Sequence, residues 1–150
     1  MAKKTWNEKL NDSGNMPYVA DIDCKFAQKF GPRMLVAPPL AYNAFMSEVP
    51  PGKILTIEQM RTVLAKKYHA DWTCFMTAGM FVNICANAAE ERGDKEFPYW
   101  RTVKTGGELC EKFPGGLEAH KMLLEIEGHK IIQKGKRYFV ENYESKLFKI

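Results

Sequence analysis

The sequence lacks a long apolar run and an apolar segment near its start. No stretch approaches the roughly 20 apolar residues that a membrane-spanning helix needs. The segment Met1–Glu8 carries positive charge, but no apolar region of the kind found in a secretory signal follows it. We therefore expect a protein of the cytoplasm that makes no contact with a membrane.

Paired cysteines and clustered histidines are also missing. The four cysteines, Cys24, Cys74, Cys85 and Cys110, form no Cys-x-x-Cys pair, and no histidine lies at metal-ligand spacing from any of them. Thiols of cytosolic proteins are usually reduced, so we expect no disulfide framework. The pattern predicts no metal site and no cofactor.

What is present is the composition of one folded domain. The chain has 150 residues, of which 45% are hydrophobic and 27% are charged, so it can bury a sizeable core without cross-links. The net charge of +4 permits binding to nucleic acid without indicating it. Composition alone leaves the function open.

The first third of the chain reads as a helical extension that packs on the remainder as part of one compact unit. It contains no repeat and no low-complexity tract, so turns and prolines mark its elements. We assign residues 1–48 to this extension. Its expected elements are helices near Thr5–Leu10 and Asp21–Phe30, an apolar run Met34–Ala37, and a helix Leu40–Val49 that Pro38 and Pro39 open.

Two helices with a short connection follow. Thr56 is placed to cap a helix that ends near Tyr68, and Thr73 or Thr77 to cap a second helix that runs to about Glu91. Such a pair is a candidate helix-turn-helix.

The remaining segments predict a small amount of β-structure. We expect a short wing hairpin of Arg101–Val103 and Glu108–Cys110, a helix Leu117–Glu127 stopped by Gly128, and a closing hairpin within residues 131–140. The predicted fold class is mainly α with small β, a winged helix-turn-helix DNA-binding domain.

Four segments in this order carry a resemblance to a known family. They are Val49–Thr56 with its Pro-Gly-Lys, Pro98–Val103, Gly115–Leu117, and Leu123–His129 with its Glu-Gly-His. From Val49 to the end, about two-thirds of the chain, the sequence resembles the DNA-binding domain of the O6-alkylguanine-DNA alkyltransferases and their alkyltransferase-like relatives. We assign residues 49–150 to this domain.

The resemblance implies a helix-turn-helix that enters the minor groove of double-stranded DNA and a pocket that receives a flipped, alkylated base. Enzymes of the family carry Pro-Cys-His-Arg, in which the cysteine accepts the alkyl group. Here the matching residues are Pro98, Tyr99, Trp100 and Arg101, and the family's glutamate matches Glu127. A phenol with a pKa near 10 is a poor nucleophile at neutral pH, so we expect no enzyme. The alkyltransferase-like relatives also lack the cysteine and signal to repair proteins.

The matching positions give a set of expected site residues. Tyr99 and Trp100 either stack on an extruded base or fill a collapsed pocket. Met80 is either an apolar wedge for DNA or, as we favour, part of the core. Ile57 matches a tyrosine of the family, and either Gly79 or Met80 matches its arginine. The expected base pocket is Tyr99, Trp100, Phe113, Pro114, Gly115 and Glu127, and the expected DNA contacts are Lys53, Thr73, Thr77, Met80, Asn83, Asn87, Arg101 and Lys104. For Arg101 the resemblance also implies a structural role, in which it ties its loop to the body of the domain.

Three functions remain open. The favoured one is a monomeric, non-enzymatic protein that binds alkylated DNA and signals repair. The second is a winged-helix module that serves transcriptional regulation or protein interaction without recognising lesions. The third is an enzyme that uses Cys74, Cys85 or Cys110 as the acceptor, although none of the three matches the floor of the family's pocket.

Overall fold

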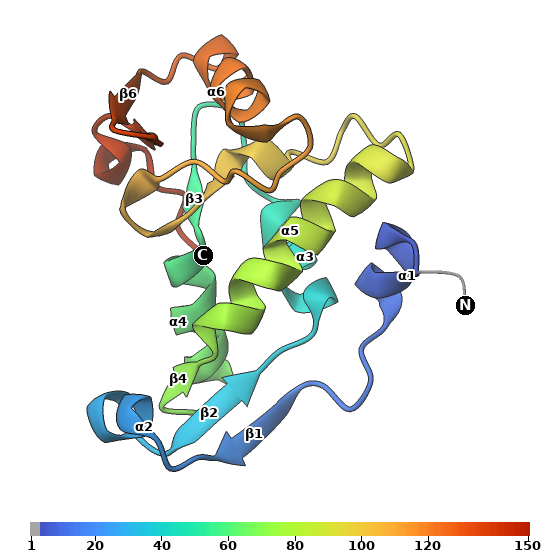
Figure 1. Cartoon of the computed structure of the whole chain (residues 1–150), viewed down its shortest axis with the longest axis vertical. Helices are drawn as coiled ribbons and strands as arrows, with labels where there is room; N and C mark the ends of the chain where they lie inside the picture. The colour runs from blue at the N-terminus through green and yellow to red at the C-terminus, as the bar shows by residue number, and fades with distance from the viewer. Residues whose placement is uncertain (1–3) are drawn as a thin grey trace.

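The amino-terminal third combines helices with two strands. A computed structural model describes residues 4–150 (Figure 1). Strands β1 (Tyr18–Asp21) and β2 (Arg33–Val36) are antiparallel, with Tyr18 opposite Val36, and β4 (Trp72–Thr73) joins β2 in parallel. The expected helical extension was therefore wrong in part, because long-range pairing with β2 makes a strand of residues around Asp21. The helices here are α1 (Trp6–Asn11), α2 (Lys25–Phe30) and α3 (Pro39–Met46).

Helix α4 (Ile57–Lys67) begins where the sequence predicts. The Thr56 hydroxyl accepts a hydrogen bond from the backbone N–H of Gln59 at 3.1 Å, and the Gln59 side chain accepts one from the Thr56 N–H at 2.8 Å. This reciprocal capping satisfies two amides that a helix start leaves without partners. The predicted cap is confirmed.

Helix α5 (Phe75–Glu91) begins without a side-chain cap. Its N-cap residue is Cys74, not Thr73 or Thr77 as predicted. Thr73 lies in β4 and donates its hydroxyl hydrogen bond to the Arg61 carbonyl, whereas Thr77 donates to the Cys74 carbonyl. Pairing of β4 with β2 therefore decides where α5 starts.

The predicted wing hairpin does not form. β5 (Thr102–Val103) pairs in parallel with β3 (Leu55–Thr56), and Glu108 forms a bridge with Phe139 of β7 (Arg137–Val140). A backbone hydrogen bond from the Lys104 N–H to the Glu108 carbonyl closes the loop between β5 and Glu108. Both predicted strands found partners elsewhere in the chain, which local turn signals cannot reveal. The short helices η1 (Tyr99–Arg101) and η2 (Thr105–Gly107) flank β5.

The carboxy-terminal elements agree with the sequence. Helix α6 (Gly116–Ile126) is followed by Gly128 at a φ of 91°, a backbone conformation that favours glycine. Strands β6 (Ile131–Lys134) and β7 form the expected antiparallel hairpin, and η3 (Tyr143–Lys146) follows it. This end of the molecule lies opposite the β1–β2 pair in Figure 1.

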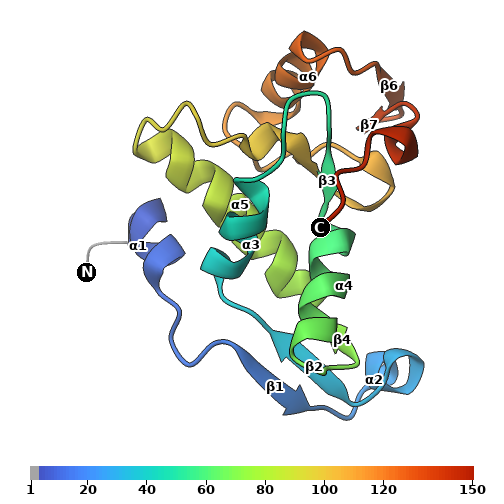
Figure 2. The ribbon, with the colours of Figure 1, turned by 180° about the vertical axis from the view of Figure 1, so that it is seen from behind.

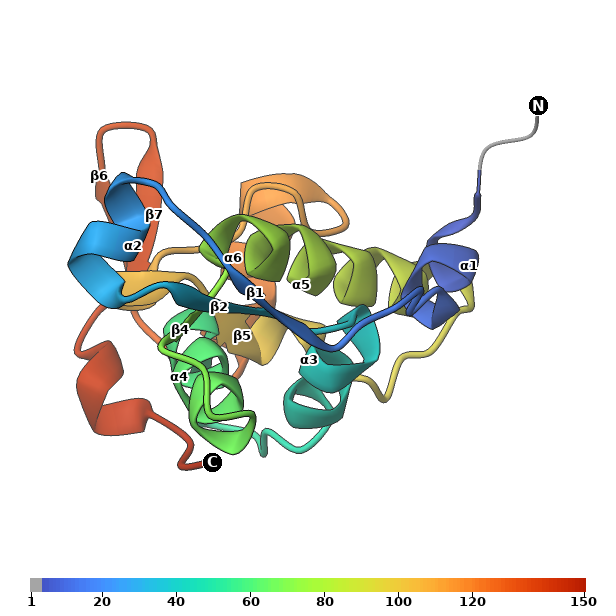
Figure 3. The ribbon, with the colours of Figure 1, turned by 90° about the horizontal axis from the view of Figure 1, so that it is seen from below.

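Helix α5 is the centre of the main core. α1 and α3 pack against α5, and α3 is seen best in Figure 2. In Figure 3, β1 and β2 run past α5 between α1 and α2. Buried apolar residues of the first third, such as Leu35 and Tyr42, form one cluster with Met60 of α4 and Val82 of α5. A second cluster, which includes Ile54, Val103, Leu124 and Val140, lies beneath α6 and the final hairpin. Within residues 4–150 no helix has the length and apolarity to cross a membrane.

Candidate nucleic-acid interface

Tyr99 and Trp100, which the sequence comparison matches to the family's cysteine and histidine, are packed against their neighbours. Tyr99 is 8% exposed, and its ring meets those of Trp100 and Phe113 edge-to-face, with centroids 5.4 and 5.6 Å apart. Burial also raises the pKa of the Tyr99 phenol. Because the rings of Tyr99 and Phe113 already fill this space, the structure favours the packing alternative over stacking on a base.

A buried histidine holds the same segment from the other side. His120 is 1% exposed, and its Nδ1 accepts a hydrogen bond from the Cys110 N–H at 3.0 Å. Its Nε2 must therefore carry the proton and donate to the Trp100 carbonyl, 2.8 Å away. Burial lowers the pKa of His120 to about 4. Sequence reasoning missed this residue, although it lies four positions before the buried Leu124 on the inner face of α6.

Arg101 joins three distant segments. Its Nε lies 2.9 and 3.0 Å from the two carboxylate oxygens of Glu127, and its Nη1 donates to the Val49 carbonyl at 2.7 Å. The side chains of Arg101 and Glu127 are only 13% and 12% exposed. These contacts agree with the structural role that the resemblance implies for Arg101. They leave no free guanidinium for its predicted contact with DNA. Glu127 likewise faces Arg101 and not an open base pocket.

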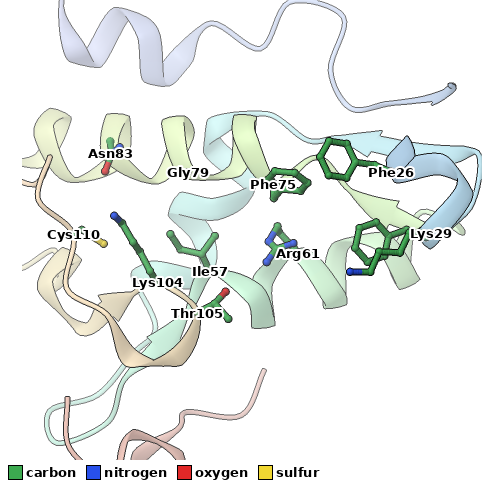
Figure 4. Close-up of a pocket in the computed structure, with 11 residues that line it drawn as sticks. Phe26, Lys29, Ile57, Arg61, Phe75, Gly79, Asn83, Lys104, Thr105 and Cys110 are labelled. Carbon is green, nitrogen blue, oxygen red and sulfur yellow. The ribbon is translucent and has the colours of Figure 1, made fainter. Parts of the chain in front are cut away.

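An open groove lies beside this buried segment, between α4 and α5. It encloses about 580 Å³ and is bounded by α2 at one end and by the loop after β5 at the other (Figure 4). Sequence reasoning placed only Asn83 and Lys104 of its lining at a DNA contact. The lining residues are Phe26, Lys29, Phe30, Ile57, Arg61, Phe75, Gly79, Asn83, Lys104, Thr105 and Cys110.

The groove is cationic. Lys29, Arg61 and Lys104 line it, and no acidic side chain does. Among residues 4–150, the ion pairs involve none of these three cations. The Nε of Arg61 is buried and has no hydrogen-bond partner within that range. Charges without a protein partner along a recess are suited to bind an anion.

Met80 is exposed, contrary to the core interpretation that we favoured. It is 58% exposed, and Met76, one turn before it on α5, is 66% exposed. Packing of α5 uses the opposite face, where Ala78, Val82 and Cys85 are fully buried. The two methionines flank a smaller recess next to the groove, shared with Asn83 and Lys104.

Of the other predicted DNA contacts, some are exposed to solvent and some are already hydrogen-bonded within the protein. Lys53 is exposed in the loop before β3. Thr73 is 2% exposed and hydrogen-bonded inside the protein, so its predicted contact with DNA was wrong. Thr77 is half-buried. Asn87 donates its side-chain hydrogen bonds to the carbonyls of Asn83 and Lys112, which ties α5 to the loop before α6.

The loop before α6 lies close to the first turn of that helix. Pro114 is half-buried and Gly115 is exposed. Gly115 has a φ of 81°, and a side chain at this position would come within 2.5 Å of the Cβ of Ala119. Glycine is therefore needed for the turn itself.

Two of the three candidate acceptor cysteines, Cys85 and Cys110, are buried. Cys110 borders the groove but is 1% exposed, and burial raises the pKa of its thiol to about 12. Burial likewise raises the pKa of the Cys85 thiol to about 12, and the Cys85 thiol points to the Pro39 carbonyl. Alkyl transfer needs a thiolate, which burial disfavours at both positions. Cys74 is half-exposed at the start of α5 and lies outside the groove lining.

Six lining residues were not singled out by the sequence analysis: Phe26, Lys29, Phe30, Arg61, Phe75 and Thr105. A signal existed for two positions, since Phe26 and Phe30 stand four residues apart and therefore share one face of α2. Arg61 stands four residues after Ile57 on α4, so these two share a face as well. No short-range sequence pattern indicates that these faces of α2 and α4 line the same groove.

Comparisons with known proteins agree on the fold. No family model matches the chain, and no curated protein is similar to it in sequence. The fold is similar to the crystal structure of Schizosaccharomyces pombe (S. pombe) Atl1 in complex with damaged DNA containing O6-carboxymethylguanine, at 17% identity and a TM-score of 0.52. It is also similar to S. pombe ATL in complex with DNA, at 17% identity and a TM-score of 0.51. Each similarity covers 75% of this chain and 94% of the other. The expected alkyltransferase-like fold is thus supported, without the wing hairpin.

Proposed function

We propose that this chain is a non-enzymatic, alkyltransferase-like protein that binds double-stranded DNA and recognises alkylated guanine. The observation that carries the proposal is the cationic groove between α4 and α5, which contains no acid. It occurs in a fold similar to that of two proteins seen in complexes with DNA, one of them damaged. A row of unpaired cations beside an exposed helix face is suited to a phosphate backbone.

Helix α5 is the element that we propose to enter the minor groove. Its exposed face carries Met80 and Met76, and other minor-groove proteins insert apolar side chains of this kind between base steps. Asn83 and Lys104 lie next to the methionines and are placed to contact sugar and phosphate. The same recess is lined by Lys112 and Glu111, so its border carries two cations and one acid. The methionines and these cations lie on adjacent parts of the surface.

The groove, in preference to the buried Tyr99 segment, is the proposed place for an extruded base. Ile57, Gly79 and Asn83 border it near the methionines, and Gly79 leaves open space where a side chain would stand. A base that is extruded from the duplex loses its stacking contacts with the neighbouring bases. Apolar walls of a recess can replace part of these contacts. We propose that repair proteins act on the complex, because the protein itself has no activated acceptor.

A titration of DNA duplexes tests the proposal. The protein is titrated with matched duplexes that contain guanine or O6-methylguanine, each at two salt concentrations. We expect tighter binding to the alkylated duplex and weaker binding at the higher salt concentration. Equal affinity for both duplexes removes lesion recognition, and absence of binding at low salt removes DNA binding and favours the protein-interaction alternative.

Two variants connect the titration to the groove. Lys104→Gln removes a groove cation, and Lys136→Gln, in the turn between β6 and β7, removes an exposed lysine away from the groove. Both change the net charge equally. Only Lys104→Gln is expected to weaken binding markedly, and equal effects would place the DNA elsewhere.

Mass spectrometry tests the absence of transfer. After incubation with DNA containing O6-methylguanine, the mass of the protein is expected to stay unchanged. A gain of one methyl group would show that a cysteine accepts the alkyl group and would overturn the non-enzymatic part of the proposal.

A further inference from the structure

Aromatic rings gather at the end of the groove next to α2. The ring of Phe26 lies 5.2 Å from that of Phe75 in an edge-to-face arrangement, and the ring of Phe30 lies 5.6 Å from that of Trp72. The Trp72 ring is held by a hydrogen bond from its Nε1 to the Gly31 carbonyl at 2.9 Å. Four rings from three separate segments thus form one cluster.

The cluster leaves aromatic surface open. Phe30 is 45% exposed and Phe75 is 36% exposed, and both line the groove. Helix α2 has no fully buried residue, so it attaches to the body mainly through these partly exposed rings. Exposed surface of this kind, gathered at one place, indicates a binding site more than isolated exposed residues do.

Two of the groove's three cations stand at the same end. Lys29 comes from α2 and Arg61 from α4, and Figure 4 shows both beside Phe26 and Phe75. The Nζ of Lys29 lies 5.3 Å from the centroid of the Phe30 ring. Cations next to exposed rings, without acids among the lining residues, complement a chain that alternates phosphates with flat bases.

The rings can engage only bases that are unpaired. In a duplex, the faces of each base are covered by the neighbouring base pairs, so side chains reach only the base edges in the grooves. A ring recessed in a groove can stack on a base only after the base has left the helix. We infer that this end of the groove binds a short single-stranded DNA segment. Its bases stack on Phe30 and Phe75, and its phosphates lie at Lys29 and Arg61.

This inference rests on the proposed DNA binding and narrows its substrate class. It makes unpaired DNA, such as a gap, a bulge or a frayed end, a better ligand than an intact duplex of the same length. The groove would then hold the displaced segment while α5 contacts the adjoining duplex.

Oligonucleotide binding by the full chain tests the inference. Fluorescence anisotropy measures the affinity for a labelled oligothymidylate, a gapped duplex and an intact duplex. The first two are expected to bind more tightly than the third. Phe30→Leu and Phe75→Leu retain an apolar side chain but remove the ring. Each is expected to weaken oligothymidylate binding roughly five- to 150-fold, the loss that follows from removing one base–aromatic stack.

Control variants separate stacking from general damage. Tyr18→Leu removes another exposed ring, at the start of β1 and outside the groove lining, and is expected to leave the affinity unchanged. Lys29→Gln tests the cation without altering a ring. If Phe30→Leu detaches α2, as seen by circular dichroism, Phe75→Leu and Lys29→Gln still decide the outcome.

The results distinguish this inference from the function on which it rests. Duplex binding without oligothymidylate binding would overturn the inference and leave the proposed function intact. Oligothymidylate binding that is insensitive to Phe30→Leu, Phe75→Leu and Lys29→Gln would place the strand elsewhere and overturn it as well. Failure to bind any of the three DNAs would overturn both.

Discussion

Two neighbouring regions of the molecule differ in how their charges are used. In the buried junction, defined as Tyr99–Arg101 with Phe113, His120 and Glu127, Arg101 is paired with Glu127 and both ring nitrogens of His120 are hydrogen-bonded. In the groove, Lys29, Arg61 and Lys104 have no acidic partner among the lining residues. The junction uses its charges to hold segments together, whereas the groove leaves its charges available for a ligand.

The segment that carries the sequence resemblance is therefore not the part of the molecule that is open to a ligand. The Pro98–Arg101 segment carries the resemblance to the alkyltransferases, yet its side chains are mostly enclosed. The groove residues Phe26, Lys29 and Arg61 belong to no recognised motif, yet they line the open recess. Substitutions in the junction are therefore expected to change stability, and substitutions in the groove to change binding.

The largest expected effect comes from breaking the ion pair of the junction. Glu127→Ala leaves the Arg101 guanidinium, which is 13% exposed, without its carboxylate. Removing one partner of a buried pair typically costs about 3–5 kcal/mol of unfolding free energy. Urea unfolding measures this loss, with Glu125→Ala, an exposed carboxylate on α6, as the control. A loss of about the same small size for both variants would show that the junction does not depend on the pair.

The second expected effect is a dependence of stability on pH. The pKa of His120 is lowered from 6.5 to about 4 in the folded state. Between these values the unfolded chain binds more protons than the folded one, so stability is fully present above about pH 6.5 and falls as the pH decreases toward 4. The loss from this residue alone amounts to about 3 kcal/mol at most.

Unfolding measured across this pH range tests the assignment to His120. His120→Gln is expected to flatten the dependence, because glutamine does not titrate. His69→Asn removes an exposed histidine and is expected to leave the slope as it is; asparagine tolerates the positive φ of 55° at this position. Burial also lowers the pKa of His129, which adds to the slope in the same direction, so a residual slope is expected in His120→Gln. An unchanged slope would assign the effect to groups other than His120.

A smaller effect is expected at the start of α4, which carries Arg61 into the groove. Thr56→Ala removes the hydroxyl that accepts from the Gln59 N–H, and loss of such a cap costs about 0.5–2 kcal/mol. Thermal or urea unfolding measures it against Thr62→Ala, an exposed threonine later in the same helix. Equal stability of the two variants would mean that the cap contributes nothing measurable.

The smallest expected change in stability, with a clear change in binding, is at Arg61. Arg61→Gln is expected to alter the unfolding free energy by less than about 0.5 kcal/mol, since its guanidinium has no ion-pair partner in residues 4–150. The affinity of the Arg61→Gln variant for DNA is expected to fall. The slope of log affinity against log salt concentration is expected to decrease by about 1, which corresponds to the loss of one phosphate contact. An unchanged salt slope would show that Arg61 does not contact DNA, contrary to the role assigned to the groove.

Capping residues, glycines and turn patterns predicted the elements whose ends are set by residues close to them in the sequence. Thr56 with Gln59, Gly128 after α6, and the β6–β7 hairpin were all readable from the sequence. The wing hairpin and the helix start at Asp21 were wrong, because β5 and β1 found their partners in distant segments. Met80 was misplaced for a related reason, since two apolar faces of α5 compete and only packing decides which one is covered.

The sequence by itself predicted that the acceptor chemistry is missing, because Tyr99 and Trp100 match the positions where the family that it resembles has a thiol and an imidazole. It also determined the order of the helices, since capping and spacing act within a few residues. Only the tertiary structure decided that Arg101 faces Glu127 and that α2, α4 and α5 enclose one groove. These contacts join residues that are well separated in the chain, such as Arg101 with Glu127 and Lys29 with Arg61. The free energy that selects them comes from burial and pairing between these segments.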